Sequence, residues 1–223
     1  MANTRRVLKW AKFFIALVLM PLCLGAVGAL WKVVRASGHA DTIWVAFLAG
    51  AACWLVVFLM LPKPMWIYVF GHELTHVLYT WLFGGQVKKF KASAKGGQVV
   101  VTKNNFVISL APYFFPLYAV LVVLFFLTGH LIWNWTRYTV WFHLLLGAAY
   151  AFHVTLTWHI LQGKQSDLVQ HGYIFSAVVI VLGNLGLLLV GIPLLTARVG
   201  VLTALSWWLQ STETVLRRLA GII

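Results

Sequence analysis

Long apolar runs constrain this chain more than any other feature. A helix needs roughly 20 apolar residues to cross the ~30 Å hydrocarbon layer of a bilayer, and about six runs approach that length. Since only helices and closed barrels satisfy their backbone in lipid, the runs predict an all-α polytopic membrane protein, integral to the cell membrane. They cover residues 13–31, 42–61, 65–83, 106–127, 138–161 and 173–195.

The composition supports a membrane protein. Of the 223 residues, 62% are hydrophobic and only 9% are charged, whereas soluble domains carry about a quarter of charged residues. Lys and Arg total 17 against four acids, which gives a net charge of +13. We expect these cations to contact anionic lipid headgroups rather than nucleic acid, because no separate basic domain is present.

Residues 197–223 differ from the apolar runs. Their polar side chains fall on one helical stripe, with Trp207 and Trp208 beside it, which predicts an amphipathic interfacial helix with both tryptophans at headgroup level. The stripe consists of Ser206, Gln210, Glu213 and Arg217.

The third run contains His-Glu-x-x-His, with His72, Glu73 and His76. Two histidines four residues apart share one face of a helix, so both can bind one zinc ion while Glu73 acts as general base. Ionisable side chains inside a membrane are costly unless they are paired or metal-bound. The alternative is a chance match, with both histidines hydrogen-bonded to neighbouring helices.

A catalytic zinc usually takes three protein ligands and one water. Asp167, before the last run, is the predicted third ligand, although Ser166 or Asp167 could instead cap a helix. His171, four residues later, is a reserve ligand or an outer-shell partner. The remaining intramembrane histidines, His143, His153 and His159, are expected to be satisfied core residues.

Residues 86–105 form the longest polar stretch. Two strand-like segments flank a turn at residues 94–97, which predicts a β-hairpin after the motif helix. This hairpin is either an ordinary solvated loop or an edge that pairs with an unwound substrate. Further on, Ala111-Pro112 and Pro116 predict a break near the start of the fourth run.

Gly71-His72-Glu73-Leu74-Thr75-His76 in a membrane helix, followed by Asp167 at a later helix, resembles the site-2 protease family of intramembrane zinc metalloproteases. The resemblance implies zinc on His72, His76 and Asp167, with Glu73 as general base. It also implies a β-structured stretch after the first catalytic helix. We therefore expect one membrane domain, with two leading segments in residues 1–62, a protease core in 63–196 and an amphipathic tail in 197–223.

The expected activity is zinc-dependent hydrolysis of peptide bonds within or next to transmembrane segments of protein substrates. Two alternatives stay open. One is a zinc or proton transporter, in which histidines such as His153 and His171 continue a path from the metal. The other is a catalytically silent relative that binds membrane partners.

Overall fold

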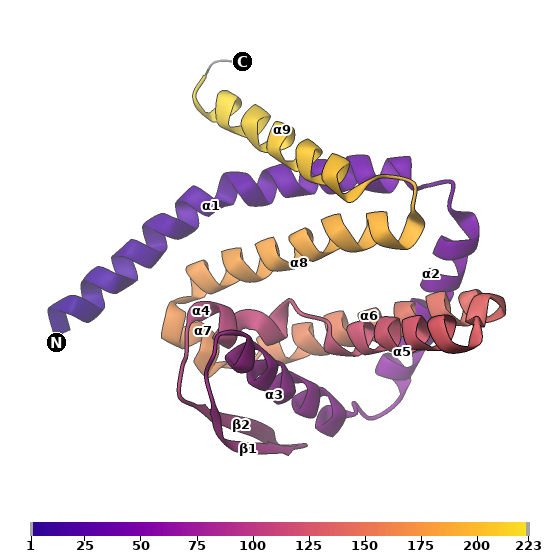
Figure 1. Ribbon diagram of the computed structural model, residues 1–223. Coiled ribbons are helices and arrows are strands. Elements are labelled where there is room, and N and C mark those ends of the chain that lie inside the picture. Colours follow the sequence, from indigo (N-terminus) through magenta and orange to yellow (C-terminus); the bar gives the residue numbers. More distant parts are fainter. Residues whose placement is uncertain (1, 222–223) are drawn as a thin grey trace. The chain divides into compact units, whose positions relative to one another are not determined.

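Two compact units make up the computed structural model, which describes residues 2–221 and, from residue 10 onward, their side chains. The terminal unit consists of residues 2–40 and 166–221 of the described chain, and the central unit consists of residues 41–165. Both are built mainly of helices, and the central unit also holds a two-stranded sheet (Figure 1). The prediction of a helical chain with one small hairpin is confirmed at this level.

The terminal unit contains α1 (Ala2–Ala36), α7 (Ser166–His171), α8 (Tyr173–Thr196) and α9 (Val201–Leu219). Helix α1 packs against both α8 and α9. Its contact with α9 is close at Gly25, where a Cβ atom would lie 2.7 Å from the Thr212 Cα. Small residues allow such backbone approach between apolar helices, so Gly25 explains the tight α1–α9 contact.

Helix α9 carries the predicted polar stripe, and within it the exposed Arg217 donates to Glu213 at 2.8 Å. Trp208 also contacts α1. It is half-buried, and its indole Nε1 donates to the carbonyl oxygen of Leu22 in α1 at 2.8 Å. The Trp208 N–H therefore has a partner inside the protein, which the spacing of polar residues along α9 did not predict, and the position of both tryptophans at headgroup level stays a prediction.

The central unit includes α2 (Asp41–Met60), α5 (Leu117–Trp133) and α6 (Thr139–Leu161), and α6 packs against both of the others. Helices α2 and α6 meet through two glycines. A Cβ atom at Gly50 would lie 1.8 Å from the Leu144 carbonyl oxygen, and one at Gly147 would lie 1.9 Å from the Phe47 carbonyl oxygen. The two backbones are thus in direct contact.

The motif lies on α3 (Met65–Leu82), which begins directly after Pro64 and is followed by the hairpin. Strands β1 (Val87–Ser93) and β2 (Gly96–Val101) are antiparallel, with Phe90 opposite Val99, and both contact α3. The predicted hairpin is confirmed, but Gly97 belongs to β2 and not to the turn.

A sharp break follows the hairpin. Helix α4 (Phe106–Leu110) and the 3-10 helix η1 (Ala111–Tyr113) are bent by 77° from α5. The predicted break is therefore confirmed, and it follows from prolines that cannot continue a helical hydrogen-bond pattern. A second 3-10 helix, η2 (Trp135–Tyr138), connects α5 to α6.

Four helices of the described chain are long and apolar enough to cross a membrane, or five if the bent pair forms one span. These lengths are consistent with a membrane protein. Helix α3 is not among them, because its histidines, glutamate and threonines lower its hydropathy. The sixth span, the membrane orientation of the helices and the single-domain division into residues 1–62, 63–196 and 197–223 stay predictions.

Candidate metal centre

Helix α3 places His72 and His76 on one face, one turn apart, as the spacing predicts. The two imidazole centroids are 5.0 Å apart and the rings meet at 78°, edge to face. Tyr113 of η1 packs against His72 with a centroid distance of 5.1 Å, and the Tyr113 side chain is fully buried. Two imidazoles held this close are a suitable nitrogen pair for one metal ion.

The tautomer of His76 is set by a backbone carbonyl. Its Nδ1 donates to the carbonyl oxygen of Ile108 in α4 at 2.8 Å, so the lone pair lies on Nε2. Metal-binding histidines usually use their second nitrogen in this way, which orients the ring and raises its basicity. Ile108 lies near the end of a short helix, where carbonyl oxygens lack intrahelical partners.

Asn105 in turn fixes the start of α4. Its side chain caps the helix and accepts from the backbone N–H of Ile108 at 2.9 Å. Ile108 is therefore held by Asn105 on its amide side and by His76 on its carbonyl side. Neither Asn105 nor Ile108 was predicted from the sequence to support the metal site. An Asn directly before an apolar helix start is a recognisable cap signal, but its connection to His76 depends on tertiary structure.

Glu73 is 8% exposed and lies against strand β2. A Cβ atom at Gly97 would lie 2.4 Å from Glu73 Cγ and 2.5 Å from Glu73 Oε1. Only a glycine fits this close to the carboxylate without displacing it. The hairpin therefore covers the one acidic side chain of α3, and the sequence pattern did not predict that contact.

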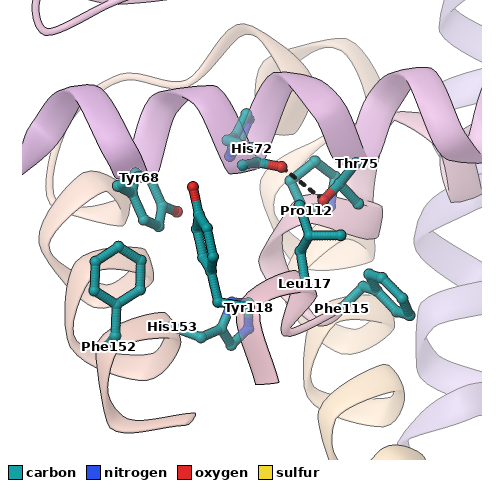
Figure 2. Close-up of a pocket in the computed structure, with 10 residues that line it drawn as sticks. Tyr68, His72, Thr75, Pro112, Phe115, Leu117, Tyr118, Phe152 and His153 are labelled. Carbon is teal, nitrogen blue, oxygen red and sulfur yellow. Dashed lines mark hydrogen bonds between the residues drawn. The ribbon is translucent and has the colours of Figure 1, made fainter. Parts of the chain in front are cut away.

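A small cavity lies beside His72, between α3 and the α5–α6 side of the central unit (Figure 2). Its volume of about 20 Å³ is enough for one water molecule. Thr75 closes part of it and donates its hydroxyl to the Gly71 carbonyl at 2.8 Å. Most of the wall is apolar or aromatic, and the lining comprises Tyr68, Gly71, His72, Thr75, Pro112, Phe115, Leu117, Tyr118, Phe152 and His153.

The expectation that the α6 histidines are satisfied core residues is wrong for His153. His153 is 6% exposed, as expected for a core residue. Within the described part of the chain, however, its Nε2 has no hydrogen-bond partner. His143 is also buried, at 7% exposure, but it does not line the cavity.

Asp167 lies in the first turn of α7 and is half-buried. It belongs to the terminal unit, whereas both motif histidines belong to the central unit. Its role as third ligand therefore stays a prediction. The choice between a ligand and a helix cap is open for the same reason.

His171, the reserve ligand, already has a partner within the terminal unit. The Lys12 ammonium donates to His171 Nδ1 at 2.8 Å, which leaves the ring proton on Nε2. Burial lowers the pKa of His171, and the Lys12 charge lowers that pKa further, against a smaller opposing effect of Asp167. In this neutral form neither ring nitrogen offers a lone pair to a metal, because Nδ1 accepts from Lys12 and Nε2, which has no hydrogen-bond partner in the described chain, carries the proton.

The motif helix, the carbonyl that orients His76 and the covered carboxylate form one arrangement within the central unit. That arrangement suits a metal ion bound by nitrogen, with an acid–base group next to it. Comparison with known proteins adds no relative: no family model, no curated protein and no solved structure matches the chain.

Proposed function

We propose that this protein is an intramembrane zinc metalloprotease, which hydrolyses peptide bonds within or next to transmembrane segments of other proteins. The hydrogen bond from His76 Nδ1 to the Ile108 carbonyl carries the proposal, because it prepares Nε2 for a metal. A buried glutamate beside the two histidines adds the acid–base group. His72, His76 and Asp167 would hold the ion, and two nitrogens with one carboxylate oxygen suit zinc.

A bound zinc would acidify a water molecule and polarise the scissile carbonyl. Glu73 takes the proton from the attacking water and later gives it to the leaving amine. Its burial beneath β2 supports this role, since a carboxylate shielded from bulk water keeps the transferred proton close to the reacting groups.

The substrate class follows from the surroundings of the motif. A transmembrane helix has its carbonyls bonded internally, so it must unwind locally before a peptide bond can be attacked. Each strand of the two-stranded sheet has one edge without a neighbouring strand in the described chain. An unwound segment can pair with such an edge next to Glu73. Anionic lipid headgroups are the proposed contacts for the basic side chains outside the spans.

The test is cleavage of a transmembrane protein substrate by the purified protein in proteoliposomes. Glu73→Gln should keep its zinc but lose cleavage by at least about 100-fold, because a general base contributes roughly that factor or more. Glu213→Gln is the control, since Glu213 is exposed on α9 and pairs only locally with Arg217. Full cleavage by Glu73→Gln would refute the proposal.

The same preparation separates the alternatives. Metal flux into the proteoliposomes that survives Glu73→Gln would favour a transporter. Zinc binding without cleavage or flux by the wild type would favour a silent relative. A loss of zinc in Asp167→Ala would assign the third ligand.

A further inference from the structure

His153 combines three properties that suit it to bind a molecule in the cavity. It lies on α6, its side chain is only 6% exposed, and its Nε2 has no hydrogen-bond partner in the described chain. Figure 2 shows His153 and Phe152 on one side of the cavity, across from α3, which carries His72. A buried polar atom without a partner is rare and costly, so it indicates a partner that binds from outside the chain.

The hydroxyl groups around the cavity are already used. Tyr118 donates its hydroxyl to the Ile67 carbonyl, and the hydroxyls of Tyr68 and Thr157 share a hydrogen bond of 3.2 Å. Thr75 donates to the carbonyl oxygen one turn earlier in α3. On the α6 side of the cavity, the His153 Nε2 is thus available to an incoming molecule.

The size of the cavity limits what that molecule can insert. About 20 Å³ fits one water molecule or one oxygen atom of similar size, but no large side chain. An unwound transmembrane segment brings such oxygens, because each broken helical turn leaves backbone carbonyls without donors. In an apolar environment these carbonyls require a donor from the enzyme.

We infer that His153 is a substrate-binding residue whose Nε2–H donates to a backbone carbonyl oxygen of the unwound substrate, next to the bond to be cleaved. The inference rests on the proposed function, since it concerns the same site. It adds a donor from α6, a helix that the His-Glu-x-x-His motif does not include. His153 would thereby hold the substrate backbone beside His72 while the cleaved bond faces Glu73.

The test measures binding separately from cleavage. In the Glu73→Gln background, the affinity for a fluorescent single-span peptide with a central Gly-Pro pair is measured in detergent micelles. Adding His153→Leu should weaken binding about tenfold, the effect of losing roughly one buried hydrogen bond. His153→Gln should retain most of the affinity, because its amide can donate. His143→Leu, on the same helix but away from the cavity, should bind like the parent.

Zinc content and thermal unfolding of each variant complete the experiment. Unchanged zinc with weaker peptide binding in His153→Leu, and rescue in His153→Gln, support the inference. Equal peptide binding by His153→Leu and its parent would overturn it while cleavage by the wild type still supports the proposed function. Loss of zinc in His153→Leu would also overturn it, because His153 would then act on the metal site. No peptide binding by the parent would refute the inference together with the proposed function.

Discussion

Gly97→Ala tests the contact between the hairpin and Glu73, the proposed general base. A Cβ atom at this position would lie 2.4 Å from Glu73 Cγ, and ordinary contact begins at 3.4 Å. The Glu73 side chain must therefore withdraw by about 1 Å, because the strand is held by its pairing of Gly97 with Ala92. A displacement of that size at a reacting group can cost about 100-fold in rate.

The expected result is a fall in kcat of about 100-fold, equivalent to roughly 2.7 kcal/mol in the activation free energy. Folding stability should change by no more than about 1 kcal/mol, since alanine suits a strand better than glycine and offsets part of the displacement. Zinc content should remain that of the wild type. The rate is measured by single-turnover cleavage of a transmembrane substrate in proteoliposomes, with zinc determined on the same sample.

Gly163→Ala is the matched control, because its nearest atoms, Gln165 Nε2 and the Ile160 carbonyl oxygen, would both lie 3.5 Å from the new Cβ. It should cleave at the wild-type rate. Cleavage by Gly97→Ala at the wild-type rate would show that Glu73 does not act from its position beneath β2. Loss of zinc in Gly97→Ala would show that the whole of α3 has moved.

Three further predictions concern the supporting structure. Gly147→Ala should lower the free energy of unfolding by about 1–3 kcal/mol in thermal or denaturant unfolding. In the control Gly186→Ala the new Cβ meets no atom within 4 Å, so the free energy of unfolding should not change. Equal stability of Gly147→Ala and the wild type would contradict the close α2–α6 contact. Asn105→Ala removes the cap of α4 and should weaken zinc binding about tenfold in a chelator competition, and unchanged affinity would separate the cap from the metal site. Burial and Lys12 lower the pKa of His171 below its usual 6.5, so the contribution of His171 to the free energy of unfolding is fully present above pH 6.5 and decreases as the pH falls below that value. Lys12→Met should raise this pKa in an NMR titration, and an unchanged pKa would contradict the contact between Lys12 and His171.

Features that depend on short stretches of sequence could be predicted. The common face of His72 and His76 follows from helical spacing alone. The hairpin follows from two strand-like segments around glycines, and the break follows from Pro112 and Pro116. Each of these depends on residues that are close in the chain, so local rules were sufficient.

Features that depend on tertiary contacts could not be predicted. The partner of His76 is the backbone carbonyl of Ile108, and because every residue type has a backbone carbonyl, the sequence does not reveal this partner. Gly97 was assigned to the turn, but it lies in β2, where only a glycine leaves room for the Glu73 side chain. His153 was expected to be satisfied, as most buried histidines are, and only its surroundings reveal the unpartnered nitrogen.

The span count shows a different limit. The third apolar run was expected to be a transmembrane helix, and α3 forms there, but the motif residues lower its hydropathy below that of the four helices that are apolar enough to cross a membrane. If α3 is catalytic, as proposed, it carries in the membrane the polar residues that lower its hydropathy. The proposed function and the hydropathy therefore point in opposite directions in this segment.

The zinc content of the purified protein decides whether α3 carries a zinc site. After loading with zinc and removal of excess ion, elemental analysis should find about one zinc per chain in the wild type, and the same in Glu73→Gln and in the control His143→Ala. His72→Ala and His76→Ala should each lose most of it. A wild type without zinc, or a His76→Ala variant that retains the full amount, would refute a zinc site on α3.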